Sequence, residues 1–218
     1  MLQVKDVHYQ PATSEKSVLK GINLEVHSGE PVIISGLSGS GKTTLLEVIS
    51  GLAIQQKGKI SFNKKRLNAR QRRWLSGVVF QFPERHFLGL TVSQELRLGY
   101  SRISTEKQIQ ILNKVGLKNI NLKKPPEKLS GGEQRRLAIA TQLIKEPTIL
   151  ILDEPTAGLD WSVRGEIVEL LKRISNNAIL IIMSHEPELF KEWIFSFFEL
   201  KEGKLQVKSQ LNNANMIE

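Results

Sequence analysis

Residues 36 to 43 read Gly-Leu-Ser-Gly-Ser-Gly-Lys-Thr, and this stretch decides how the rest of the chain is interpreted. It satisfies the pattern G-x-x-x-x-G-K-[ST], follows an apolar segment at 31–35 and precedes a helical pattern at 42–50. Glycines let the backbone turn so that successive N–H groups point inward, and the following helix adds unpaired N–H groups and the positive end of its dipole. We therefore predict a phosphate-binding loop between a strand and a helix.

The residue types in this loop predict a nucleotide, ATP, and a magnesium ion as ligands. Lys42 is expected to reach the β- and γ-phosphates, and the Thr43 hydroxyl is expected to ligate Mg²⁺. A glycine-rich turn that carries a lysine by chance is the alternative, but four specified positions recur by accident in roughly 1 in 100 chains of this length. Nucleotide binding is the stronger interpretation, and its expected contacts are Gly36, Leu37, Ser38, Gly39, Ser40, Gly41, Lys42, Thr43 and Thr44.

Apolar segments alternate with helical patterns along the chain, which predicts an α/β fold with a mostly parallel sheet covered on both faces. The expected strands are 2–8, 18–26, 31–35, 59–62, 75–80, 148–152 and 178–183, followed by a hairpin over 195–207. The expected helices are 42–50, a pattern within 91–116, one from Ser130 that stops before Pro147, 162–174 and a short one at 186–193. The N-terminal strands are expected to form an antiparallel flank, and the polar tail 212–218 to fray.

Length and composition are those of one globular domain. The chain has 218 residues, of which 40% are hydrophobic and 24% charged. It has no cysteine, which excludes disulfides and thiolate metal sites. No segment approaches the ~18 apolar residues that cross a bilayer. The N-terminus lacks the basic and apolar regions of a secretory signal.

The formal net charge is +9, and part of the excess is concentrated. Lys57 to Arg73 holds eight lysines and arginines and no acidic residue. A solvated surface, a surface near anionic lipid headgroups and a nucleic-acid-binding surface all agree with such a run. Charge alone does not choose among them.

A second glycine motif, Leu-Ser-Gly-Gly-Glu-Gln-Arg-Arg, spans residues 129 to 136. Ser130 and Glu133 have the spacing of a capping box, so a helix is predicted to start at Ser130. Gly131 and Gly132 in the first turn would let a phosphate approach the exposed N–H groups closely. An ordinary capped helix start is the alternative interpretation of these residues.

The motif resembles the LSGGQ-type signature of ABC ATPases, with Glu133 and Gln134 at its fifth and sixth positions. This resemblance implies a P-loop NTPase core with an antiparallel β flank (1–81 and 147–211) and a small α-helical signature subdomain (82–146), together one ABC ATPase domain over 1–218. It also implies a head-to-tail dimer. In that dimer, the signature of one protomer covers the γ-phosphate of the ATP that the other protomer holds. The signature residues are Ser130, Gly131, Gly132 and Glu133.

Further motifs are similar to those of the same family. Residues 149–154, Ile-Leu-Ile-Leu-Asp-Glu, resemble a Walker B strand, which implies that Asp153 faces Mg²⁺ or its water and that Glu154 faces the attacking water. Residues 155–160 are similar to the D-loop. Asp160 also suits an N-cap for the next helix, so a structural role and a direct role both stay open.

Three more positions follow from the resemblance. Gln81 ends a strand as the Q-loop glutamine does, which implies contact with Mg²⁺ or the water. His185 matches the switch histidine that contacts the γ-phosphate. Near the N-terminus the sequence departs from the family, because Pro11 stands where a tyrosine commonly stacks on adenine. Tyr9 either shifts to stack on the base or packs against the sheet.

The resemblance implies an ATPase that drives a transporter whose membrane-spanning subunits are separate chains. Such a subunit is cytoplasmic, lies on the inner face of the membrane, and pairs with itself or with a second ABC ATPase. Residues 81–87, Gln-Phe-Pro-Glu-Arg-His-Phe, resemble the Q-loop of energy-coupling-factor and cobalt-type importers, with His86 in place of a second glutamine. The C-terminal region is shorter than those importers usually have.

A soluble ABC ATPase that acts on nucleic acid or ribosomes is the alternative. Residues 91–128 are too few for the long coiled coil of the chromosome and repair members. The zinc cysteines of the excision-repair members are absent, and the chain carries one cassette where the translation factors carry two. The sequence therefore favours a membrane transporter over nucleic acid as the partner.

Overall fold

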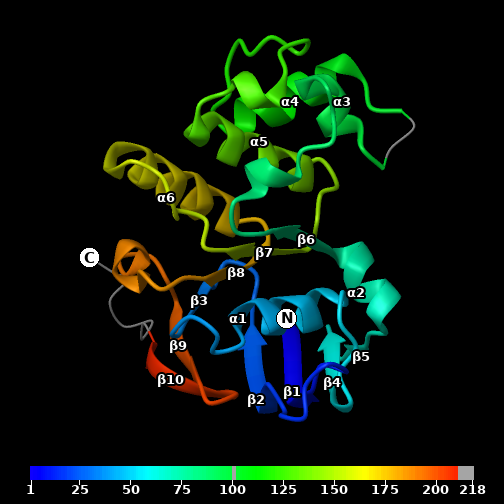
Figure 1. The fold of residues 1–218 in the computed structure, drawn as a ribbon, viewed down its shortest axis with the longest axis vertical. Coiled ribbons are helices and arrows are strands. Elements are labelled where there is room, and N and C mark those ends of the chain that lie inside the picture. The colour runs from blue at the N-terminus through cyan, green and yellow to red at the C-terminus, as the bar shows by residue number, and fades with distance from the viewer. Residues whose placement is uncertain (100–101, 211–218) are drawn as a thin grey trace.

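The computed structural model describes residues 1–99 and 102–210, so the predicted fraying of 212–218 lies outside the described residues (Figure 1). The strands are β1 (Leu2–Tyr9), β2 (Leu19–Val26), β3 (Val32–Ser35), β4 (Lys57–Phe62), β5 (Lys65–Arg66), β6 (Ser76–Val79), β7 (Ile149–Asp153), β8 (Ile179–Met183), β9 (Ser196–Lys201) and β10 (Lys204–Gln210). The α-helices are α1 (Lys42–Ser50), α2 (Ala69–Leu75), α3 (Val92–Arg97), α4 (Thr105–Lys114), α5 (Gly131–Leu143) and α6 (Trp161–Ser175). Short 3₁₀ turns lie at Pro83–His86, Pro126–Lys128 and Pro187–Phe190.

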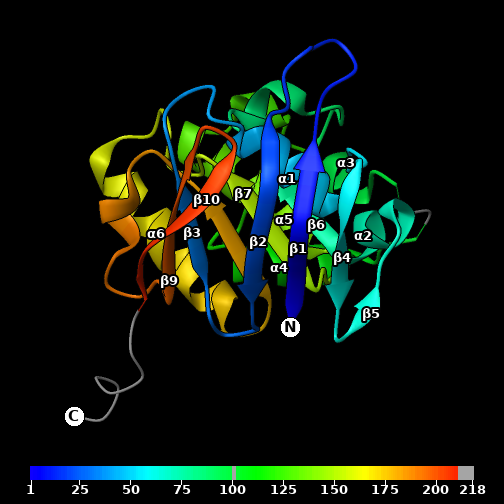
Figure 2. The same ribbon diagram turned by 90° about the horizontal axis from the view of Figure 1, so that it is seen from below.

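The strands form two sheets, as predicted. One has the order β10-β9-β3-β8-β7-β6, in which β9, β3, β8, β7 and β6 run parallel and β10 pairs antiparallel with β9. The other is antiparallel, with the order β2-β1-β4-β5. Figure 2 shows β2, β1 and β4 side by side in front of α1. The predicted parallel sheet with an antiparallel flank is confirmed.

Alternate side chains of the buried strands pack in two separate hydrophobic cores. In β7, Leu150 and Leu152 belong to one apolar cluster and Ile149 and Ile151 to the other. The first cluster fills the space between the parallel sheet, α5 and α6. The second joins the opposite face of that sheet to α1 and to the antiparallel sheet. Because both faces of β7 are covered, its run of aliphatic residues is what a central parallel strand requires.

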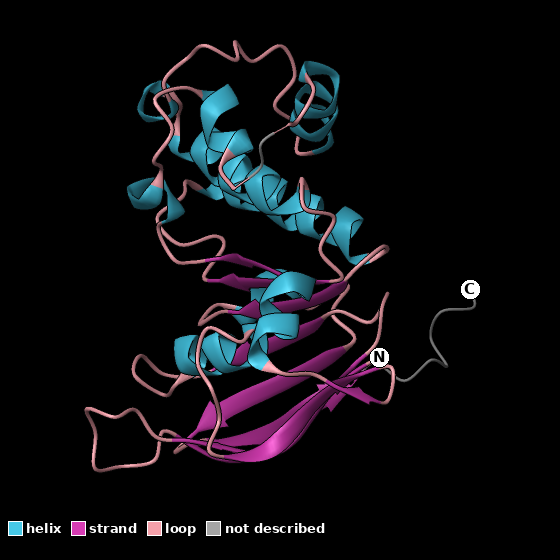
Figure 3. Cartoon of the chain, turned by 90° about the vertical axis from the view of Figure 1, so that its right-hand side faces the viewer, coloured by secondary structure: helices cyan, strands magenta, loops and turns pink. Residues whose placement is uncertain are grey.

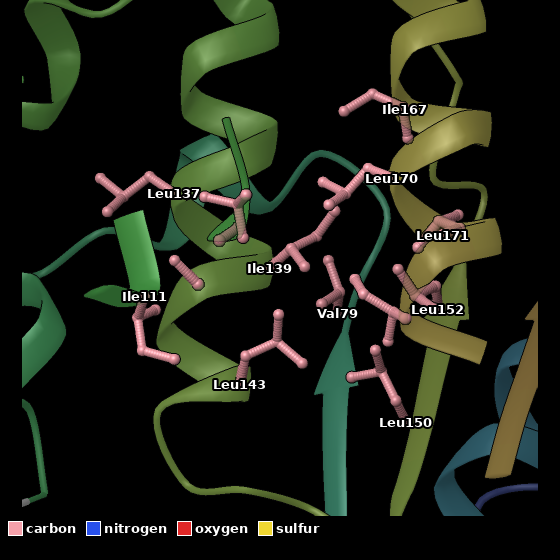
Figure 4. Close-up of a cluster of buried hydrophobic side chains, with 14 of the residues drawn as sticks. Val79, Ile111, Leu137, Ile139, Leu143, Leu150, Leu152, Ile167, Leu170 and Leu171 are labelled. Carbon is pink, nitrogen blue, oxygen red and sulfur yellow. The ribbon is translucent and has the colours of Figure 1, made fainter. Parts of the chain in front are cut away.

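Helices α3, α4 and α5 lie together at one end of the molecule, above the edge of the parallel sheet at β6 (Figures 1 and 3). Figure 4 shows how α5 and α6 meet the sheet, with Ile139 and Leu143 of α5 and Leu170 of α6 directed towards Val79 and Leu152. The end of α5 therefore has a rigid apolar support on the sheet. The division into a core and a helical subdomain with the boundaries given above stays a prediction.

The sequence prediction missed one helix and misjudged two others. Helix α2 overlaps the end of the basic run and follows Asn68, which forms a capping box with Gln71 that was overlooked. The helical pattern in 91–116 divides into α3 and α4. The short helix predicted for 186–193 is only a 3₁₀ turn at Pro187–Phe190. In the part of the chain that the structure describes, no helix is both long and apolar enough to pass through a bilayer.

Candidate nucleotide site

A cavity of about 780 Å³ opens at the carboxyl edge of the parallel sheet. Strands β3, β8, β7 and β6 are neighbours there, so the segments that follow them meet at one edge. The cavity is lined by most of the predicted site residues, namely Gly36, Leu37, Ser38, Gly39, Gly41, Lys42, Thr43, Thr44, Gln81, Asp153, Glu154 and His185. Residues from four distant parts of the sequence therefore converge on one site.

The loop between β3 and α1 needs glycine at two of its positions. Gly41 is the N-cap of α1 and has φ 102°, and a Cβ there would lie 2.9 Å from Cγ1 of Val18. A Cβ on Gly36 would lie 2.6 Å from the carbonyl oxygen of Leu200. No side chain caps α1, and its first turn holds no acidic residue. The N-terminus of α1 therefore offers N–H groups and a positive dipole end to an anion.

Lys42 lies across the inner side of this loop. Its Nζ donates hydrogen bonds to the carbonyl oxygens of Gly36 at 2.8 Å and Leu37 at 3.3 Å, and lies 3.9 Å from Oε1 of Glu154. The side chain is only 9% exposed. A buried ammonium beside the uncapped N-terminus of α1 makes this part of the cavity suited to a polyanion.

Thr43 and Asp153 form the polar corner of the cavity. The Thr43 hydroxyl donates a 2.7 Å hydrogen bond to Oδ2 of Asp153, which is buried at the end of β7. Burial raises the pKa of the Asp153 carboxyl, and the Thr43 hydrogen bond opposes part of that rise. The folded protein thus carries a carboxylate that is poorly solvated, and a cation beside it would restore the lost stabilisation.

This donor set fits a magnesium ion. A carboxylate and a hydroxyl oxygen are hard ligands, and the Gln81 amide lines the same cavity. Within residues 1–99 and 102–210, no three His, Cys, Asp or Glu side chains group closely enough to hold a metal by themselves. Mg²⁺ commonly takes one or two protein oxygens and completes its shell with phosphates and water, which agrees with this arrangement.

Glu154 and His185 form a second pair in the lining of the cavity. The Glu154 carboxylate accepts the His185 backbone N–H at 3.1 and 3.2 Å, and its Oε2 lies 2.8 Å from Nδ1 of the ring. Glu154 has φ 48°, in the left-handed region that a non-glycine residue rarely adopts. Backbone strain of this kind often occurs at functional sites.

The signature residues lie away from the cavity of the same chain. Ser130 caps α5: its Oγ accepts the Glu133 N–H at 3.3 Å, and Oε2 of Glu133 accepts the Ser130 N–H at 2.8 Å. The predicted capping box is therefore confirmed. Gly131 is exposed, whereas a Cβ on Gly132 would lie 2.6 Å from Cγ1 of Val163 in α6.

Three other predicted residues also lie outside this cavity. Tyr9 is half-buried against the apolar cluster of the antiparallel sheet. Ser40 lines an adjoining cavity of about 580 Å³, which reaches to the β9–β10 hairpin. Asp160 occupies the N-cap position of α6, but its side chain makes no capping hydrogen bond. Asp160 therefore stands at the N-cap position predicted for it, but it does not stabilise α6 through a capping hydrogen bond.

The sequence analysis overlooked several residues that contribute to the site. Val18, Pro187 and Glu199 line the cavity, and Arg135 donates hydrogen bonds to the backbone carbonyls of Glu154, Pro155 and Ala157. No local pattern identifies Val18 or Glu199, because they reach the cavity only through the pairing of distant strands. Arg135 was within the quoted signature motif, and its spacing from Ser130 places it more than one turn into the helix.

The ABC transporter family model matches residues 19–157. The energy-coupling factor transporter ATP-binding protein EcfA2 of Acetivibrio thermocellus is 35% identical over 228 residues, which covers 97% of this chain and 81% of that protein. The solved structure of cbiO1 from Clostridium perfringens, part of the ABC transporter complex cbiONQ, has a TM-score of 0.83 and 32% identity and covers 94% of this chain and 86% of that one. A dimeric ATP-binding cassette in a post-hydrolysis state, bound to ADP and Pi, has a TM-score of 0.80 and 26% identity, covering 97% and 99% of the two chains.

Proposed function

We propose that this chain, which belongs to the ABC transporter family of ATPases, hydrolyses ATP as a subunit of a transporter whose membrane-spanning parts are separate chains. The observation that carries the proposal is the cavity itself. It brings a phosphate-type loop, a lysine, a hydroxyl–carboxylate corner and a Glu–His pair within one volume of about 780 Å³. These are the groups that phosphoryl transfer to water requires.

The loop and α1 bind the triphosphate. Backbone N–H groups around Gly39 and Gly41 surround the β-phosphate, and the Lys42 ammonium exchanges its carbonyl partners for β- and γ-phosphate oxygens. Thr43, Asp153 and Gln81 would hold Mg²⁺, which neutralises charge on the phosphates when bound. The adjoining cavity that Ser40 lines gives room for the ribose and base.

Glu154 acts on the attacking water. Its carboxylate lies on the cavity wall, where it orients the water and accepts a proton from it. The water oxygen bonds to the γ-phosphorus as the bond from that phosphorus to the β–γ bridging oxygen breaks, and ADP and phosphate leave. The backbone N–H of His185 donates to that carboxylate, and the His185 side chain is exposed. In this proposal the His185 ring contacts the γ-phosphate. Lys42 stabilises the negative charge that develops on the transferring group.

The signature residues act on the ATP of a second cassette. None of these four residues lines the cavity of its own chain: Ser130, Gly131, Gly132 and Glu133. Their role therefore requires a second protomer, whose bound ATP presents its γ-phosphate to them. The dimeric relative bound to ADP and Pi supports such an assembly. ATP then favours the closed dimer, and hydrolysis removes the contacts that favour closure.

The partners proposed are integral membrane subunits, with the chain peripheral to the inner face of the membrane on the cytoplasmic side. Leu88 and Leu90 support this, because each is 79% exposed just after the segment that follows Gln81. A groove of about 200 Å³ lies beside them, lined by Phe80, Pro83 and Phe87 among others. Exposed aliphatic side chains beside a groove indicate a protein-binding face. The resemblance to energy-coupling-factor and cobalt-type ATPases agrees with two relatives above, EcfA2 and cbiO1.

The hydrolytic part is tested with Glu154→Gln. This change removes the proton acceptor while keeping the side-chain shape, so ATP affinity should stay within about twofold, turnover should fall by about 10²–10⁴-fold, and ATP-bound dimers should accumulate. Glu146→Gln is the matched control, because Glu146 is exposed and remote from the cavity. Normal turnover of the Glu154 variant would remove this residue from its role.

The transport part is tested by purification of the chain from native membranes. An integral membrane subunit should co-purify with it. Recovery of the chain without any membrane protein, together with a salt-dependent shift of nucleic acid, would instead support the soluble alternative.

A further inference from the structure

Arg135 is an arginine buried in the middle of the molecule. It lies in α5, is 1% exposed, and donates hydrogen bonds to the carbonyl oxygens of Glu154 at 3.0 Å, Pro155 at 2.9 Å and Ala157 at 3.1 Å. Burial lowers the pKa of the guanidinium, and the charge of Glu84 opposes that shift. A buried cation is costly unless hydrogen bonds compensate it, and here every one of these bonds goes to the turn after β7.

The turn that Arg135 holds carries the residue assigned to the attacking water. Glu154 has φ 48°, so its backbone conformation is not the one that this residue adopts by itself. His185 binds the carboxylate, and Arg135 binds the carbonyl oxygen of the same residue. Two separate elements thus fix the two ends of Glu154.

The same turn is contacted from a second side by the segment after Gln81. Oε2 of Glu84 lies 3.7 Å from Nη2 of Arg135. Phe82 packs against Gly158, where an added Cβ would lie 3.2 Å from the ring and where φ is 73°. The Arg85 guanidinium lies 4.7 Å from the centroid of the Phe82 ring. The segment 82–86, α5 and the turn 154–158 are therefore one connected unit.

The geometry points to Arg135 as a positioning residue for ATP hydrolysis, one that holds the Glu154 backbone in its strained conformation and, through Glu84, couples it to the segment 82–86. The inference rests on the proposed role of Glu154. A movement of the segment 82–86 would change the Arg135–Glu84 contact and with it the orientation of the Glu154 carboxylate. Arg135 itself does not line the cavity, so its effect is on turnover and not on nucleotide affinity.

The test compares two buried arginines. Arg135→Lys keeps the charge, but a compact ammonium does not reproduce the planar fork with which the guanidinium spans the three carbonyl oxygens. Arg72→Lys is the matched control, because Arg72 is 2% exposed and also bonds three oxygens, those of Leu67, Ala53 and Gln55, far from the cavity. Arg135→Lys should lower kcat by about 10- to 100-fold, because small displacements of a reacting group cost that much. The Kd for ATP should stay within about twofold, and the melting temperature should change as much as in Arg72→Lys.

A double variant separates positioning from general damage. If Arg135 acts through Glu154, Arg135→Lys should lower the residual single-turnover rate of Glu154→Gln by less than about twofold. An equal loss in both backgrounds would overturn the inference, as would a kcat of Arg135→Lys within about threefold of the unaltered protein. Normal turnover of Glu154→Gln alone would instead overturn the proposed function, so the two failures are distinguishable.

Glu84→Gln gives an independent measurement if Arg135→Lys fails to fold. Glu84 is partly exposed, so its replacement perturbs the core less. It should lower kcat by about threefold or more with unchanged ATP affinity, because the Arg135 guanidinium loses the charge that fixes it on the side of 82–86. An unchanged kcat in this variant would overturn the coupling between the segment 82–86 and Glu154.

Discussion

Helices α1 and α5 both begin with glycines at their N-termini, yet the two ends differ in what they offer to a ligand. The first turn of α1 has no side-chain cap and opens into the large cavity. The first turn of α5 is closed by a reciprocal capping box between Ser130 and Glu133, and it lies outside that cavity. The two helix starts both contain glycine, but a side chain caps backbone N–H groups only at α5.

The difference shows how the work is divided within one protomer. The α1 end is surrounded by Lys42, Thr43 and Asp153 and can bind a phosphate group without help from another chain. The α5 end is held by its capping box, which gives partners to the N–H groups of Ser130 and Glu133. It lies outside the cavity, away from the charged groups there. In the function proposed above, it contributes to chemistry when a second protomer supplies the nucleotide. The comparison predicts separable effects for changes at the two ends.

The largest effect is expected for Lys42→Ala at the α1 end. Turnover should fall by about 10²–10³-fold, because a donor to the transferring group is lost. ATP affinity should fall by roughly ten- to a hundredfold, the value of a charged hydrogen bond of about 1.5–3 kcal/mol. Calorimetric titration with ATP measures it, and Lys114→Ala on α4 is the control. Unchanged affinity would contradict the assignment of the phosphate loop.

A smaller and more selective effect is expected for Gly131→Asp at the α5 end. The nearest atom to an added Cβ is Cδ2 of Leu159 at 3.7 Å, so the variant should fold. A carboxylate there would repel the γ-phosphate of the partner's ATP, and turnover should fall by about tenfold or more. The affinity of one chain for ATP should stay within about twofold. If affinity fell as much as in Lys42→Ala, the two ends would not be separable.

The smallest effect concerns the stability of the folded protein and tests the buried charge of Asp153 in the cavity. Burial raises the pKa of Asp153, so the folded state disfavours its charged form, and the free energy of unfolding falls as pH rises above the carboxyl's ordinary value. Asp153→Asn removes that charge and keeps an oxygen that accepts from Thr43. In the absence of nucleotide and magnesium it should raise the melting temperature at pH 7 by about 2–4 °C, corresponding to about 1 kcal/mol.

This gain should disappear as pH is lowered below about 4, the ordinary pKa of an aspartate, because the carboxyl is then protonated in both the folded and the unfolded state. Differential scanning calorimetry across this range measures it. Asp160→Asn is the control, since Asp160 is exposed, and it should change the melting temperature by less than about 1 °C. A lower melting temperature of Asp153→Asn at pH 7 would show that the charge is stabilised in the folded state.

Local patterns predicted most of the secondary structure of this chain. Helix α1 has the predicted bounds, and β7 and β8 lie within a residue or so of theirs, because long aliphatic runs between turn residues leave few alternatives. Helix α2 was missed because a basic, polar stretch has little apolar periodicity, although its Asn68–Gln71 capping box was visible. The helix predicted at 186–193 was too long, because only Pro187–Phe190 forms a helical turn there.

The site was predictable wherever a motif is contiguous. The loop 36–43, the pair Asp153–Glu154 and the cap at Ser130 each depend on neighbours in the chain, so their local chemistry can be read directly. Val18 and Glu199 could not be found in this way. They reach the cavity because the β9–β10 hairpin pairs with β3 and because the antiparallel sheet packs on α1.

The sequence by itself determined the family, the two glycine-rich helix starts and the types of groups that face a phosphate, since these depend on residue identity at fixed short spacing. Only the tertiary structure decided that Gln81, Asp153, Glu154 and His185 share one cavity, that Tyr9 packs on the sheet, and that Arg135 binds the backbone of Glu154. Those contacts join residues far apart in the chain. Their geometry depends on the register of the strands and the packing of α5 on the sheet, which no local pattern records.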